Sequence, residues 1–137
     1  MLAVALMVIS AGIIFALGAL HLVYTFYGNK LTPRDSALQT RMAEVSPVIS
    51  RRTTMWKTWI GFNASHSMGA LLFGLVYGYL ALAHSALLFN SAFLLGVGLL
   101  MLGGWVVLGK RYWFSVPLQG IGIALVLYVA AVVLARA

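Results

Sequence analysis

The chain has 137 residues, of which 63% are hydrophobic and 8% are charged, and its formal net charge is +7. A mean hydropathy of +1.01 lies far outside the range of soluble domains, which excludes soluble enzymes and nucleic-acid-binding domains and assigns the chain to a membrane. The chain has no cysteine, so disulfides, thiolate nucleophiles and thiolate metal ligands are excluded as well.

The first long feature is an unbroken apolar run over residues 4–27. A transmembrane helix needs about 20 apolar residues, so this run predicts the first span. Because no basic stretch precedes it and it is long, we expect a retained span and not a cleaved signal peptide. At helical spacing, one face of this span carries Ser10, Ile14, Gly18, His21 and Thr25. Since small and polar residues gather where helices pack in lipid, this face is expected to meet other helices.

A polar segment over residues 28–54 follows. Thr32 is expected to cap a short helix over residues 33–46, with Pro33 in its first position. One face of that helix carries Leu38, Met42 and Val45. The pattern predicts an amphipathic helix lying on the membrane surface.

Three further apolar runs predict spans over residues 55–83, 87–108 and 112–135. The fold class expected is therefore an all-α integral membrane protein, a four-transmembrane-helix bundle that forms a single membrane domain over residues 1–137. The second span carries polar and small residues on one face, namely Trp59, Asn63, His66, Ala70, Gly74 and Tyr77. Its other side carries Gly61, Ser65 and Gly69, a spacing that lets another helix approach closely.

The basic residues predict the orientation of the four spans. With four spans, eight of the nine basic residues fall on one side of the membrane: Lys30, Arg34, Arg41, Arg51, Arg52, Lys57, Lys110 and Arg111. Since basic loops stay in the cytoplasm, we expect both termini to face away from it. Near the boundary of that side, Arg51, Arg52, Lys57, Lys110 and Arg111 are candidates for binding lipid phosphate groups.

Three of the four spans contribute a polar side chain to one layer. With a rise of about 1.5 Å per residue, His21, Asn63 and Gln119 lie roughly 9–11 Å inside the cytoplasmic boundary, and His66 lies one turn deeper. The layer has two interpretations. Such groups often only link helices, at about 0.6 kcal/mol each. Alternatively they line a cavity in which a lipid or other hydrophobic small molecule is bound or transported. The candidate ligand-binding residues are then His21, Asn63, His66, Gln119, Trp59 and Tyr112.

Other kinds of chemistry fit less well. A haem held between His21 and His66 is disfavoured by their difference in depth, so no cofactor is predicted. No metal site is predicted either, because no acidic residue lies in any span. A lipid-modifying enzyme with His21 or His66 as base is a minority alternative, since no carboxylate orients either ring. The other alternative is a small accessory subunit whose glycine faces dock on a larger membrane complex. The partners expected are membrane lipids, a hydrophobic small molecule, and a membrane protein or a second copy of the chain.

Four stretches of the sequence resemble the small, uncharacterised four-helix membrane proteins of bacteria. They are residues 21–26 (HLVYTF), 33–35 (PRD), 54–67 (TMWKTWIGFNASHS) and 111–114 (RYWF), and the resemblance covers nearly the whole length. It implies an all-helical protein of the bacterial inner membrane, and it carries no activity with it.

Overall fold

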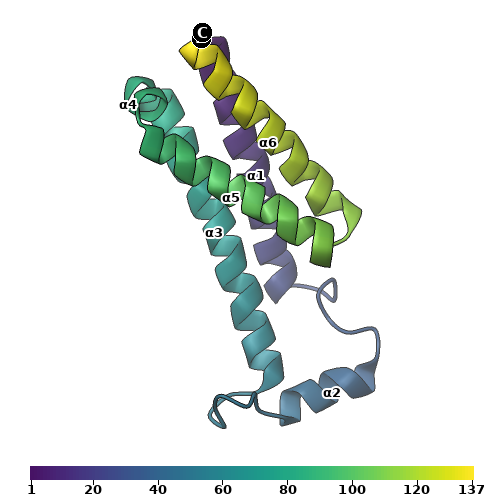
Figure 1. The fold of residues 1–137 in the computed structure, drawn as a ribbon. Helices are drawn as coiled ribbons and strands as arrows, with labels where there is room; N and C mark the ends of the chain where they lie inside the picture. Colours follow the sequence, from purple (N-terminus) through teal and green to yellow (C-terminus); the bar gives the residue numbers. More distant parts are fainter. The chain divides into compact units, whose positions relative to one another are not determined.

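The computed structural model describes residues 1–137, and its six helices are joined by short connections without any strand. The helices are α1 (Leu2–Phe26), α2 (Ser36–Glu44), α3 (Met55–Ala83), α4 (Ser85–Asn90), α5 (Ala92–Tyr112) and α6 (Ser115–Arg136) (Figure 1). Four of them, α1, α3, α5 and α6, are long and apolar enough to cross a membrane. The prediction of an all-helical chain with four such helices is confirmed.

The apolar side chains of the long helices mostly face outward. Phe62 on α3, Phe93 and Leu100 on α5 and Val126 on α6 are each more than two-thirds exposed, as part of a much larger set. Exposed apolar surface on this scale is typical of helices that are surrounded by hydrocarbon.

The predicted start of the short helix was wrong. Helix α2 begins at Ser36, and its N-cap is Asp35 instead of Thr32. The Asp35 carboxylate accepts the backbone N–H groups of Ala37 at 2.9 Å and Leu38 at 3.4 Å. Because this carboxylate satisfies two N–H groups that have no partner within the helix, the helix starts after it and Pro33 stays in the connection. The helix ends at Glu44, with Val45 in an extended conformation.

The third long helix also differs from its prediction over residues 87–108. The apolar run is broken into α4 and α5, because Ser91 adopts an extended conformation and its hydroxyl caps α5 by accepting the Leu94 N–H at 3.2 Å. At the other end, Lys110 and Arg111 lie in the last helical turn of α5 and are not part of the connection between α5 and α6. Cations are favourable at a helix C-terminus, so they extend the helix to Tyr112, and the turn falls at residues 113–114.

The chain forms two compact units. The core unit comprises Met1–Leu17 and Ala70–Ala137, and the polar unit comprises Gly18–Gly69. The expectation of a single membrane domain stays a prediction.

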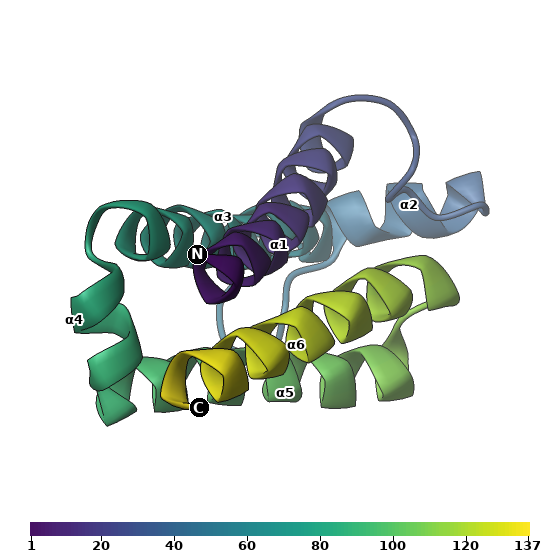
Figure 2. The same cartoon turned by 90° about the horizontal axis from the view of Figure 1, so that it is seen from above.

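The core unit contains every buried large apolar side chain of the chain, among them Met7, Ile14, Leu102 and Tyr128. Helices α5 and α6 run antiparallel as a hairpin, with α4 beside the start of α5 (Figure 2). On α1, the buried Ser10 hydroxyl donates to the Ala124 carbonyl of α6 at 2.7 Å. This unit is therefore a helix bundle packed around a mostly apolar core.

Two glycines of the core unit allow close helix contacts. A Cβ on Gly74 of α3 would lie 2.6 Å from the Phe15 Cβ and 2.8 Å from the Ala11 carbonyl oxygen of α1. A Cβ on Gly98 of α5 would collide with the ring of Tyr128, which is buried. Because a side chain would force the backbones apart, glycine is what lets these helices touch.

Candidate functional site

The buried side chains of the polar unit carry hydroxyl groups, whereas those of the core unit are mostly apolar. Its fully shielded side chains are Thr25 on α1, which is 6% exposed, and Ser67 on α3, which is 0% exposed. No buried large apolar residue of the chain belongs to this unit. Within this unit, α1 and α3 are joined by the hydrogen bond between His21 and Asn63 and by the ring contact between His21 and His66, and these three residues form the candidate site.

Helix α1 contributes His21 and Thr25, which are one turn apart. The predicted packing face of α1 is confirmed, since Ser10, Ile14, Gly18 and Thr25 are buried and His21 is half-buried. The Thr25 hydroxyl donates to the His21 carbonyl at 2.8 Å. This intrahelical bond satisfies the hydroxyl in an apolar setting.

Helix α3 contributes Asn63, whose amide is held in a single orientation. Its Nδ2 donates to the Trp59 carbonyl at 2.8 Å, and its Oδ1 lies 3.0 Å from the His21 Nε2. Because an amide oxygen only accepts hydrogen bonds, the His21 Nε2 must carry the proton. A neutral His21 ring consequently keeps its lone pair on Nδ1, the atom that can bind a donor group of a ligand.

His66 completes the cluster one turn further along α3. Its ring meets the His21 ring edge to face, with 5.4 Å between ring centroids and 80° between ring planes. Ser67, beside it, donates its hydroxyl to the Asn63 carbonyl at 2.9 Å. The difference in depth inferred from the sequence does not keep the two imidazoles apart. The two rings are in contact, and the His21 Nε2 is bonded to Asn63. The expectation that no haem is held between them stays a prediction.

A hollow of about 360 Å³ lies along the same pair of helices, toward the polar connection. It is lined by Tyr24, Thr25, Phe26, Gly28, Leu31, Thr32, Gln39, Trp56 and Ile60. Thr25 lies one turn after His21 on α1, and Ile60 lies three residues before Asn63 on α3. The hollow and the cluster are thus neighbours along one helix interface. Its lining combines aromatic rings with the hydroxyls of Tyr24, Thr25 and Thr32 and the amide of Gln39.

Trp59 has a positioning role in this unit. Its indole Nε1 donates to the Leu31 carbonyl at 2.9 Å, and its own carbonyl accepts from Asn63. The first of these bonds ties α3 to the connection that follows α1, and the second fixes the Asn63 amide. Trp59 therefore links the wall of the hollow to the orientation of His21.

Two of the predicted site residues lie on the core unit. Gln119 is on α6 and Tyr112 is the last residue of α5, and both are exposed. The cluster of the polar unit thus brings together three of the candidates, His21, Asn63 and His66, with Trp59 behind them.

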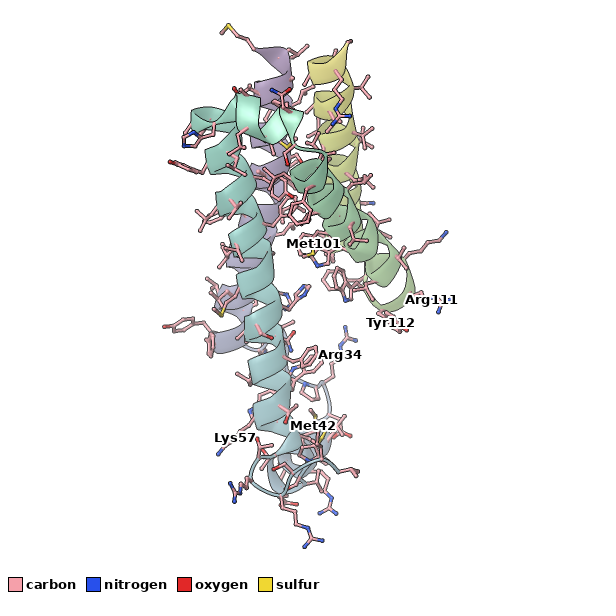
Figure 3. All side chains as sticks on the ribbon, turned by 60° about the vertical axis from the view of Figure 1, so that its left-hand side comes forward. Arg34, Met42, Lys57, Met101, Arg111 and Tyr112 are labelled. Carbon is pink, nitrogen blue, oxygen red and sulfur yellow. The ribbon has the colours of Figure 1, made fainter.

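The candidate lipid-phosphate residues are all exposed. Arg51 and Arg52 lie in the connection between α2 and α3, and Lys57 lies in the first turn of α3. Lys110 and Arg111 lie in the last turn of α5. Figure 3 shows the side chains of Lys57 and Arg111 extending away from their helices.

The hollow was missed by sequence reasoning. Its wall comes from the end of α1, the connection, α2 and the start of α3, and no local pattern joins these segments. Gln39, which lines it from α2, reads in sequence only as a polar residue of a surface helix. The available signal was the concentration of aromatic residues at 24–27 and 56–59.

No protein family, characterised protein or solved structure that was compared with this chain matches it.

Proposed function

We propose that this chain is a multi-pass protein of the bacterial inner membrane that binds or transports a lipid or another hydrophobic small molecule. The four long apolar helices cross the membrane, both termini face away from the cytoplasm, and the basic connections lie in it. The polar group of the ligand binds beside His21, Asn63 and His66, and the hollow between α1, α2 and α3 admits it from the cytoplasmic leaflet.

The observation that supports this proposal is the convergence of His21, Asn63 and His66 from two long apolar helices. Polar side chains at hydrocarbon depth are costly, and they are typical of ligand sites when they face the helix bundle. Here the amide and one imidazole are held in fixed orientations, so little conformational entropy is lost when a ligand binds.

The chemistry of the cluster restricts the ligand. The chain has only two acidic residues, Asp35 and Glu44, and neither lies in a long helix. Without a carboxylate the site offers nothing to balance a cation. With its Nε2–H bonded to Asn63, His21 offers the lone pair of Nδ1, which accepts a hydrogen bond from a hydroxyl or amide group of a ligand. We therefore expect a neutral or anionic amphiphile.

Native mass spectrometry of protein released from its own membrane in mild detergent tests the proposal. Wild-type protein is expected to carry a bound small molecule of defined mass. The His21→Ala and Asn63→Ala variants each remove a hydrogen bond at the site, which costs about 1–3 kcal/mol when a buried partner is left unpaired. Each substitution also removes a group proposed to bind the ligand, and losing a ligand hydrogen bond of that strength lowers the affinity roughly 5- to 150-fold, so both variants are expected to lose the adduct.

The matched control is Ser10→Ala, which also removes a buried interhelical hydrogen bond but lies in the core unit. We expect it to keep the adduct. If all three variants retained the ligand equally, or if wild-type protein carried none, the cluster would be a packing contact and not a binding site.

A second candidate function is that of an accessory subunit, and the open glycine side of α3 favours it. A Cβ added to Gly61 or Gly69 would meet no atom within 4 Å. Small residues that contact nothing in their own chain leave room for a helix of another protein. On this alternative, a stoichiometric partner copurifies with wild-type protein in mild detergent, and the Gly61→Leu variant loses it while keeping its small-molecule adduct.

A further inference from the structure

The connection between α2 and α3 exposes two aliphatic side chains. Val48 is 108% exposed and Ile49 is 93% exposed, and among large apolar residues only the terminal Met1 matches them. They lie outside the four long helices, in the most polar segment of the chain. A hydrophobic tip in such a segment is costly in water, at about 25 cal/mol for each Å² of apolar surface left exposed.

The tip is held out by a closed loop over residues 45–55. The Met55 N–H donates to the Val45 carbonyl at 2.8 Å and joins the two ends of the loop. Within it, the Ser50 N–H donates to the Pro47 carbonyl at 3.1 Å, and the Ser50 hydroxyl accepts the Arg52 N–H at 3.2 Å. A loop with this many internal bonds presents its tip in a defined way.

Two arginines follow the tip directly. Arg51 and Arg52 are exposed, and the only ion pair of the chain joins Arg41 to Glu44. The other acid, Asp35, is bonded to the first N–H groups of α2. The loop therefore combines an aliphatic tip with two cations that have no carboxylate partner.

We propose that this loop is a membrane-surface anchor, in which Val48 and Ile49 insert between lipid headgroups and Arg51 and Arg52 bind the phosphates of anionic lipids. Aliphatic residues beside cations are typical of segments that bind an anionic membrane surface.

We favour a lipid leaflet over a protein as the binding partner of this loop because of the helix that follows the loop. It leads straight into α3, whose first turns carry Trp56 and Trp59. Tryptophan is enriched at the headgroup level, so the loop begins at that level. The inference rests on the membrane placement proposed above and is independent of the ligand at His21.

Because the chain has no cysteine, single-cysteine labelling tests the anchor cleanly. The Ile49→Cys variant is labelled with a polarity-sensitive fluorophore and reconstituted into phosphatidylcholine vesicles with or without phosphatidylglycerol. A fraction of the lipid carries a shallow spin-label quencher. The controls are Phe62→Cys, at an exposed position of α3, and Thr40→Cys, at an exposed position of α2.

We expect the label of Ile49→Cys to shift to the blue and to be quenched in vesicles with phosphatidylglycerol, as the label of Phe62→Cys is in both lipids. The label of Thr40→Cys should stay in water. Adding Arg51→Gln and Arg52→Gln to Ile49→Cys should remove most of the quenching.

If the label on Ile49→Cys behaved like that on Thr40→Cys in both lipids, the anchor proposal would be overturned. It would also be overturned if the Ile49→Cys label were shielded from water only in native membranes, where partner proteins are present. If the quenching did not change when phosphatidylglycerol was left out or when the two arginines were substituted, Arg51 and Arg52 would not contribute to membrane binding. An unquenched label on Phe62→Cys would instead show that the membrane placement itself is wrong.

Discussion

Asn63 is the residue on which the geometry of the polar unit depends. It accepts from His21 and donates to Trp59, so a single amide joins α1 to α3 and also selects the tautomer of His21. Its neighbours Thr25 and Ser67 donate to backbone carbonyls of their own helices, so their hydroxyls do not link α1 to α3. Because the oxygen and the nitrogen of the amide are both hydrogen-bonded, the amide can hold an imidazole in one orientation in an apolar medium.

The tautomer of His21 is directly measurable. We expect solid-state NMR of the protein labelled with ¹⁵N-histidine to show that the neutral His21 ring carries its proton on Nε2 and not on Nδ1. The His66→Gln and His84→Gln variants assign the signals. In Asn63→Ala the Nε2 loses its acceptor, so a mixture of tautomers should appear. A wild-type His21 protonated on Nδ1 would mean that the Asn63 amide has the opposite orientation.

At the scale of the elements, α3 has different partners along its length. Its residues 55–69, which include Trp59, Asn63 and His66, belong to the polar unit, and its residues 70–83, which include Gly74 and Tyr77, belong to the core unit. Tyr77 donates its hydroxyl to the Leu94 carbonyl at 2.6 Å. One helix thus serves both units, with polar contacts in one and close apolar packing in the other.

The close approach of α1 and α3 at Gly74 predicts a large difference between two similar substitutions. In Gly74→Ala the new methyl group would lie within 3.0 Å of backbone atoms of α1, so the helices must separate, at a cost of about 1–3 kcal/mol of unfolding free energy. In Gly78→Ala, one turn further on, the nearest atom is the Ala11 Cβ at 3.9 Å, which is an ordinary contact. Unfolding in mixed micelles measures both, and equal stability of the two variants would contradict the tight contact.

For the whole molecule, the distribution of charge predicts its orientation. The basic residues flank the α1–α3 and α5–α6 connections, and His84 lies in the connection between α3 and α4. In intact spheroplasts we expect an impermeant thiol reagent to label His84→Cys and Ala137→Cys from outside. Lys30→Cys and Lys110→Cys should react only after the membrane is opened. The reverse pattern would contradict the positive-inside assignment.

Much of the fold is local and could be predicted from the sequence. The apolar runs identify four long helices because span length depends only on hydrophobicity and rise per residue. The packing face of α1 was predicted correctly through the spacing of Ser10, Gly18 and Thr25, since in lipid small and polar residues turn toward other helices. The start of α2 and the break at Ser91 were not, because they depend on which side-chain oxygen accepts the first N–H groups of each helix.

By itself, then, the sequence determined the class of the protein, its four long helices and the residue types available for chemistry, because these depend on composition and helical period. Only the tertiary structure decided which polar side chains meet. It brought the rings of His21 and His66 into contact although depth along the helices seemed to separate them, and it placed Gln119 on the core unit. The physical reason is that ring contacts depend on helix rotation, tilt and side-chain rotamers, which arise from contacts between residues distant in the chain.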